Sequence, residues 1–351
     1  MHIVNRKTIA ALGAAVSAVL LAACGSGASS EASSKLTVAT SSANTFQAEL
    51  YIAEQLGYTD KYGVDVEYVN SGALGATQVA AGKADLAQFG TAAAFGPAAQ
   101  GRDVSIIYGL VNNISRGIGV STQSPIREGT TEDVLKQLSG AKLVTQGTVG
   151  AAYGNSVMVA QWVEDHGGER PTIVSVDTAD GPTAQLISGQ ADAALGLPDY
   201  SAAAIAEGKL KMIVPNTDPV MAEITGGDFP AATLFGLKSN LQSKSKAVTG
   251  YIAALRDAHQ YVMTTPLSEV AAELAKHPAF AGQSAELIES TLKYDPPFLA
   301  PDDGRITKDN WDKALDVMKY HNTGQDLTQD TFSYDQIIDM SYWNGATELR
   351  N

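Results

Sequence analysis

Two loops of the sequence combine many hydrogen-bonding groups with an absence of charge, which suits the capture of a small ligand. Residues 40–47 read TSSANTFQ and residues 146–153 read QGTVGAAY, so both supply hydroxyl or amide groups, and the second has glycines that allow close backbone approach. If each loop opens a helix, its unpaired N–H groups carry a partial positive charge that favours a small anion. Ordinary helix N-capping by Ser, Thr and Asn is the alternative for each loop.

Several other residues have the chemistry to complete a ligand site beside these loops. Arg116 is the most attractive cation for an anionic ligand, with a surface ion pair as the alternative. Phe46 and Tyr153 are candidates for the walls of a cleft, with burial in the core as the alternative. The candidate ligand-binding residues are Ser41, Ser42, Asn44, Phe46, Gln47, Gly90, Thr91, Asn112, Arg116, Gly147, Thr148, Val149, Gly150, Tyr153 and Asp199.

Signatures of catalysis and of nucleic-acid binding are missing from the sequence. The five histidines are scattered without metal-binding spacing, and there is no nucleophile elbow or phosphate-binding loop. Asp85 and Asp192 occupy matching positions of a repeat, so we expect a structural role for both. The 24 Lys and Arg against 38 Asp and Glu argue against binding a phosphate backbone. We therefore expect no catalytic residue, no metal and no cofactor.

An internal repeat, at an offset of 189 − 82 = 107 residues, determines the expected fold. The pattern Gly-x-Ala-Asp-x-Ala occurs at residues 82–87 and again at 189–194, and the same offset relates the β-rich segment 36–38 to 143–145. In each half, β-rich runs alternate with helical patterns that end at glycine, which indicates βαβ units around a parallel sheet. The sequence therefore predicts two similar α/β lobes.

Helical patterns follow the two loops and dominate the C-terminal third of the chain. Residues 46–56 and 156–164 have helical spacing of apolar residues, which places each loop at a helix start. Residues 233–237 are a further strand candidate. Further helices are predicted at residues 247–263, 267–276, 285–292, 308–320 and 334–343.

The N-terminus reads as an export signal followed by a tether. Arg6 and Lys7 precede an apolar run that is too short to span a membrane and ends in Leu-Ala-Ala-Cys. We expect residues 1–23 to be a signal peptide and residues 24–35 a flexible tether. The ending resembles a bacterial lipoprotein signal in which Cys24 becomes the lipidated (palmitate-bearing) first residue; a plain secreted protein is the alternative. Cleavage changes the net charge from −14 to 22 − 38 = −16.

Together, the lipoprotein start, the repeated motif, the loop at 147–153 and the segment 197–200 resemble the solute-binding proteins of ATP-driven importers. The resemblance is to the nitrate, sulfonate and taurine group, which also includes binders of thiamine pyrimidine precursors, and it covers about residues 36–320. It implies a two-lobe periplasmic-binding-protein-like fold of type II, with a mostly parallel sheet flanked by helices in each lobe and a cleft between the lobes. It also implies a two-stranded hinge and closure by lobe rotation. Lobe 1 would comprise residues 36–118 and 241–345, and lobe 2 residues 119–240.

The resemblance implies an extracytoplasmic component of an ABC importer that is anchored to the cell membrane by its lipid. It would capture a small anion, such as an alkanesulfonate, taurine or nitrate, and deliver it to the permease and its ATPase. A heteroaromatic ligand gripped between Tyr153 and Phe46 is one alternative, and an extracytoplasmic sensor is another. Related pyrimidine synthases are enzymes with a cysteine-rich motif and an active-site histidine acting with iron, which a chain with one cysteine does not match. We expect a monomer that binds no nucleic acid.

Overall fold

The structure, a computed structural model, describes residues 34–351 with the exception of residues 42, 113–115, 179, 197–200 and 295–302. From residue 32 onward the chain forms one unit. The expected signal peptide and Cys24 lie outside the described residues, and so do Ser42 and Asp199 of the candidate site. The predictions that concern them therefore stay predictions.

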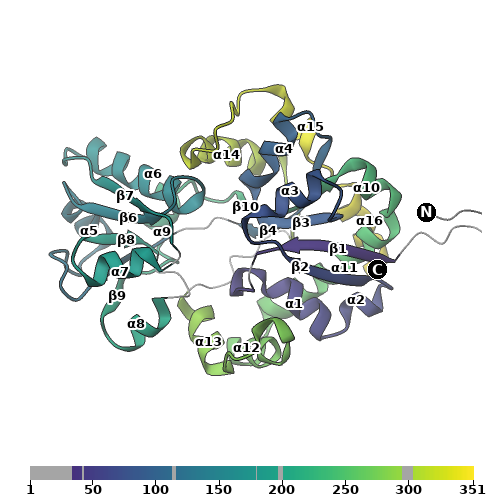
Figure 1. Cartoon of the computed structure of the whole chain (residues 1–351), viewed down its shortest axis with the longest axis horizontal. Coiled ribbons are helices and arrows are strands. Elements are labelled where there is room, and N and C mark those ends of the chain that lie inside the picture. Colours follow the sequence, from purple (N-terminus) through teal and green to yellow (C-terminus); the bar gives the residue numbers. More distant parts are fainter. Residues whose placement is uncertain (1–33, 42, 113–115, 179, 197–200, 295–302) are drawn as a thin grey trace, which may run out of the picture. The chain divides into compact units, whose positions relative to one another are not determined.

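Two five-stranded sheets carry the fold (Figure 1). The strands are β1 (Lys35–Thr40), β2 (Asp65–Asn70), β3 (Leu86–Gly90), β4 (Val104–Asn112), β5 (Ile118–Ser121), β6 (Lys142–Gln146), β7 (Thr172–Val176), β8 (Ala193–Leu195), β9 (Leu210–Val214) and β10 (Pro230–Leu237). The orders are β2-β1-β3-β10-β4 and β7-β6-β8-β5-β9. In each sheet one strand, β10 or β5, runs antiparallel to the other four. The prediction of two mostly parallel sheets flanked by helices is confirmed.

Helices cover the sheets and make up most of the C-terminal third. They are α1 (Ala48–Gln55), α2 (Tyr58–Lys61), α3 (Gly75–Ala80), α4 (Phe95–Ala99), α5 (Thr131–Gln137), α6 (Ala151–Asp165), α7 (Gly181–Ile187), α8 (Ala202–Ala206), α9 (Pro219–Ile224), α10 (Lys238–Ser243), α11 (Ser245–Thr264), α12 (Leu267–Lys276), α13 (Ala285–Tyr294), α14 (Lys308–Met318), α15 (Tyr334–Ile337) and α16 (Ser341–Arg350). The longest, α11, buries Val248, Tyr251 and Leu255 in the core that covers the first sheet. Within the described residues, no helix is long and apolar enough to cross a membrane.

The predicted repeat is visible in the strands of both sheets. β2 begins at Asp65 and β7 at Thr172, and 172 − 65 reproduces the offset of 107. The parallel pairing also repeats, because Lys35 lies opposite Asp65 and Lys142 lies opposite Thr172. The same local pattern therefore forms the same three-stranded unit in both halves.

The aspartates of the repeated motif join neighbouring strands. The carboxylate of Asp85 accepts the N–H of Thr37 at 2.9 Å, and that of Asp192 accepts the N–H of Lys142 at 2.8 Å. In return, each aspartate donates its backbone N–H to the carbonyl oxygen of the same partner. The expected structural role of both residues is confirmed.

Two expectations about the second half of the chain are wrong. The expected lobe 2 extends to residue 240, but β10 lies between β3 and β4 and so belongs to the first sheet. This moves the boundary between the halves to a point before Pro230, whereas the other domain boundaries stay predictions. The single helix expected at 334–343 is interrupted, because Ile338 forms a β-bridge with Ile106 between α15 and α16.

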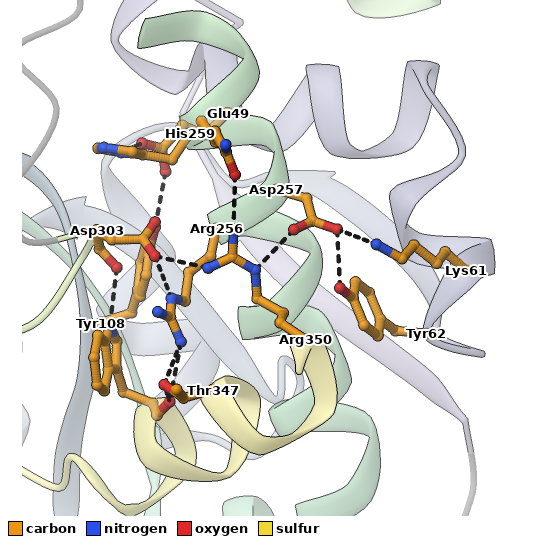
Figure 2. Close-up of polar contacts among 12 residues, drawn as sticks. Glu49, Lys61, Tyr62, Tyr108, Arg256, Asp257, His259, Asp303, Thr347 and Arg350 are labelled. Atoms are coloured by element: carbon orange, nitrogen blue, oxygen red, sulfur yellow. Dashed lines mark hydrogen bonds and ion pairs between the residues drawn. The ribbon is translucent and has the colours of Figure 1, made fainter. Parts of the chain in front are cut away.

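A buried polar network connects α1, β4 and α11 (Figure 2). His259 Nδ1 of α11 lies 2.8 Å from Glu49 Oε1 of α1, and Tyr108 of β4 donates its hydroxyl to the other oxygen of Glu49 at 3.4 Å. Burial alone would lower the pKa of His259, but the hydrogen bond and the negative charge of Glu49 outweigh it and raise that pKa. The start of α1, which carries the first candidate loop, is therefore fixed to the core.

Asp303 is the centre of the adjoining part of this network. Its Oδ2 atom accepts from Arg256 Nε at 2.5 Å and from an Arg350 nitrogen at 2.9 Å. Arg350 also bonds Asp257 at 2.8 Å, and Arg256 donates to the Thr347 hydroxyl at 2.6 Å. Each charge is therefore paired, which is what burial of charged groups requires.

We expect Asp303→Asn to lower the free energy of unfolding by about 3 kcal/mol, because it leaves two largely buried guanidinium groups without their shared carboxylate. Asp303 has a left-handed φ of 59°, which asparagine also tolerates, so the backbone should be kept. Urea unfolding measures the effect. Asp312→Asn, which removes an exposed i,i+4 pair with Lys308, should change stability by less than about 0.5 kcal/mol. Equal losses in the two variants would contradict the role of Asp303.

Candidate ligand-binding site

The first candidate loop leads into α1 and is held by a buried glutamine. The side chain of Gln47 donates to Ser41 Oγ at 3.1 Å and to the Gln88 side-chain oxygen. Tyr51 donates its hydroxyl to Gln47 Oε1 at 3.2 Å. Asn44 is extended and its side chain makes no capping bond to the following turn. Gln47 therefore shapes this loop from the core, and N-capping by Asn44 does not account for it.

The turn after β3 uses most of its polar groups internally. Thr91 is fully buried, and its hydroxyl donates to the Pro230 carbonyl oxygen at 2.6 Å. Asn112, at the end of β4, is buried opposite the same Pro230. Gly90 is exposed. Of these three candidates, Gly90 is thus exposed, Thr91 joins the turn to β10, and Asn112 is buried at the end of β4.

Arg116 lies close to Phe46 of the first candidate loop and to Gly196, which follows β8. Its guanidinium carbon is 5.5 Å from the ring centroid of Phe46, within the range of a cation–π contact. On its other side, a Cβ atom added to Gly196, at the end of β8, would lie 2.7 Å from Arg116 Cδ. The carbonyl oxygen of the neighbouring Gly117 accepts the N–H of Gly196 at 2.7 Å. The structure therefore brings Arg116 and Phe46 together beside the end of a second-sheet strand.

The second candidate loop ends at the N-terminus of α6, a helix of 15 residues. Gly147 and Gly150 have positive φ angles of 67° and 96°, which residues with side chains rarely adopt. No side chain caps this helix, and its first turn contains no acidic residue. In the part of the chain that the structure describes, no backbone carbonyl accepts the N–H groups of Ala151, Ala152 or Tyr153. The helix start thus presents three N–H groups at a turn that lacks negative charge.

A C-terminal turn holds this loop in place. The 3-10 turn η6 (Lys319–His321) follows α14, and the carbonyl oxygen of His321 accepts the N–H of Gly150 at 2.8 Å. Asn322, with a left-handed φ of 50°, donates its side-chain N–H to the Thr148 carbonyl oxygen at 2.9 Å. The two bonds fix both ends of the Thr148–Gly150 segment, so its conformation depends on residues more than 160 positions further along the chain.

His321 packs directly on α6. Its ring lies where a Cβ atom on Gly154 would have to be, so only glycine fits there. The side chain is 3% exposed, and burial lowers the pKa of His321 to about 4. The ring is therefore neutral at pH 7. Sequence reasoning did not select His321 or Asn322, because nothing local to either residue indicates a contact with a loop so distant in sequence.

The remaining candidates lie near the same helix start or outside the described residues. Val149 is 57% exposed and Tyr153 is half-buried on the first turn of α6. Ser42 and Asp199 are not described. Among the described residues, no group of His, Cys, Asp and Glu is arranged to hold a metal ion.

Comparison with known proteins identifies the family. Residues 44–269, more than half of the chain, match the family described as NMT1/THI5 like. The chain belongs to the NMT1/THI5-like family. No curated protein matches the sequence of this NMT1/THI5-like protein.

Solved structures similar to this NMT1/THI5-like protein share its fold. The periplasmic nitrate-binding protein NrtA from Synechocystis PCC 6803 is 14% identical, with a TM-score of 0.64 over 90% of this chain and 89% of that chain. The alkanesulfonate-binding protein SsuA from Xanthomonas axonopodis pv. citri, bound to MOPS, is 15% identical, with a TM-score of 0.59 over 84% and 96% of the two chains. A mutant of DszB in complex with biphenyl-2-sulfinic acid is 14% identical, with a TM-score of 0.59 over 90% and 99%.

We expect His321 to make stability depend on pH between about 6.5 and 4. Its folded-state pKa is lower than its unfolded value, so the unfolded state binds more protons in this range and stability falls as the pH falls. Relative to a His321→Leu variant, the wild type should lose about 2 kcal/mol more between pH 7 and pH 5, as measured by urea unfolding. The control His166→Leu, at an exposed histidine, should keep the wild-type profile. Parallel profiles for His321→Leu and the wild type would contradict burial of a neutral ring.

Proposed function

We propose that this protein is the extracytoplasmic substrate-binding component of an ABC importer. It captures a small anionic solute, of the alkanesulfonate, taurine or nitrate type, and delivers it to the permease. The observation that carries the proposal is the start of α6, where Ala151, Ala152 and Tyr153 present N–H groups at a glycine-containing loop without an acidic residue. Such a helix start stabilises a negative ligand through its aligned dipoles and N–H groups. The names of NrtA and SsuA support the same ligand class.

In this proposal the ligand is enclosed by movement of the two halves. Residues 36–118 and those from Pro230 onward form lobe 1, and the intervening residues form lobe 2. Arg116 and Phe46 then approach the ligand from the side opposite to α6. The ligand shifts a population of open and closed states, and the closed state presents the surface that the permease recognises.

We also propose that the protein makes and breaks no bond. The support is the sequence, which has one cysteine, at the proposed lipidation site, and no catalytic motif. Purified protein that consumed a sulfonate or a pyrimidine in the absence of a transporter would overturn this part.

We expect ethanesulfonate, taurine or nitrate to raise the melting temperature in proportion to the logarithm of its concentration once the site is saturated. Ala151→Asp should weaken that ligand at least tenfold, because the new carboxylate repels an anion at the helix start. The folded state should keep its stability, since an acidic residue is favourable in the first turn of a helix. Calorimetry and thermal shift measure the two effects.

The matched control for this test is Ala151→Asn, because asparagine has nearly the same shape as aspartate but no charge. It should bind the anion with an affinity within about threefold of the wild type, a difference of roughly 0.6 kcal/mol. If only neutral heteroaromatic compounds raise the melting temperature, the anion assignment is wrong and the alternative ligand class takes its place.

We propose that Cys24 carries the lipid that attaches the protein to the membrane. Cys24→Ser should move the protein from the membrane fraction to the soluble extracytoplasmic fraction, because it removes the proposed site of lipid attachment. Ligand affinity should stay unchanged. Retention of the variant in the membrane fraction would contradict the lipid anchor.

A further inference from the structure

A pocket of about 360 Å³ opens beyond the carboxyl ends of β1 and β2. Thr40 ends β1 and Asn70 ends β2, and Ser41 and Ala43 of the first candidate loop line the pocket beside them. Helix α1 and the segment after α12 form the remaining walls. All of these elements lie in the first half of the chain or in its helical C-terminal third. The pocket therefore contains no residue of the second sheet or of α6 among its described lining residues.

One wall carries a carboxylate in a fixed position. The N–H of Ala279 donates to His277 Nδ1 at 3.1 Å, so this ring nitrogen carries no proton. The other nitrogen, Nε2, then carries the hydrogen and donates to Glu54 Oε2 at 3.2 Å. His277 is 7% exposed, whereas the side chain of Glu54 is 45% exposed. A buried neutral histidine thus orients a carboxylate that still faces the opening.

The other walls present aromatic rings. The ring centroid of Tyr51 lies 4.9 Å from that of His277 and 5.6 Å from that of Tyr68. Tyr68 donates its hydroxyl to the Leu50 carbonyl oxygen at 2.9 Å, which fixes its ring. Tyr51 is almost fully buried, whereas Tyr68 is half-buried and lines the pocket together with the carboxylate of Glu54. An aromatic ring and a carboxylate are groups that attract an ammonium ion.

Among its described lining residues, the pocket carries negative charge only, from Glu54. None of its described lining residues is a lysine or an arginine. A neighbouring pocket of about 440 Å³ shares Glu54 and adds Asp60 and Asp65. The whole chain has a net charge of −14. These surroundings favour a cation and disfavour a sulfonate or nitrate group.

We infer that this pocket is a second binding site, which takes a small organic molecule with an ammonium group. Glu54 neutralises the charge, and the half-buried ring of Tyr68 contacts the carbon atoms that surround the nitrogen. The volume lies at the lower end of the range for small-molecule sites, so the ligand is compact. This site goes beyond the proposed function. Ser41 of the first candidate loop lines it, but its described lining residues include neither Arg116 nor Phe46 nor any residue of α6, on which the proposed function rests.

The test uses choline as the probe and 3,3-dimethyl-1-butanol, which has the same shape without the charge, as its neutral analogue. Calorimetry on the full-length protein at constant ionic strength should give one choline site and at least tenfold weaker binding of the analogue. Glu54→Gln keeps an oxygen acceptor for His277, so the variant should fold with an unchanged melting temperature. It should nevertheless bind choline at least tenfold more weakly than the wild type.

Two control variants check that choline occupies this pocket. Asp60→Asn removes a nearby charge outside the pocket and should leave choline affinity within about threefold of the wild type. Ala151→Asp, which acts on the proposed anion site, should also leave it unchanged. Absence of choline binding, equal binding of the neutral analogue, or an unchanged affinity in Glu54→Gln would overturn the inference. Loss of choline binding in Ala151→Asp would place the ammonium group in the anion site and would also overturn it.

Discussion

The docking of the His321–Asn322 turn onto the start of α6 is the interaction on which the ligand site depends. The His321 carbonyl oxygen accepts the N–H of Gly150, and the Asn322 side chain donates to the Thr148 carbonyl oxygen. The next N–H groups of the helix, from Ala151 onward, are then available to a ligand. The turn directly follows α14, and α14 is fixed in the core because Trp311 is buried and donates its ring N–H to the Phe332 carbonyl oxygen at 2.7 Å. A loop made largely of small residues thus gains a defined shape from a rigid C-terminal segment, which reduces the cost of ordering it on ligand binding.

Local electrostatics separate the two ligand environments that we propose. The chain is strongly acidic, yet the first turn of α6 contains no carboxylate, so aligned N–H groups rather than net charge determine the potential there. The pocket beside β2 has the opposite character, because Glu54 is held in place by His277. Within the core, Asp303 is paired with Arg256 and Arg350, so burial of these charges leaves none unpaired.

How much could be predicted from the sequence depends on whether the information is local. The repeat predicted the paired strands β1 to β3 and β6 to β8, because alternating strands, helices and C-terminal glycines are encoded within about 55 residues of each half. The partners of β10 could not be predicted, since a fully buried apolar strand reads the same in either sheet. Phe46 and Arg116 were selected for their chemistry, and the structure brings them together. The contacts of His321 and Asn322 were missed because they join α6 to a segment remote in sequence.

A crystal structure with the anion that most raises the melting temperature tests the proposed anion site most directly. We predict that an oxygen of the anion lies within hydrogen-bond distance of the N–H groups of Ala151 or Ala152, with the His321–Gly150 bond intact. An anion bound elsewhere, with these N–H groups facing solvent, would contradict the proposed site. Displacement of the His321 carbonyl oxygen by the ligand would also contradict it, because the turn would then be a competitor of the ligand and not the support of its site.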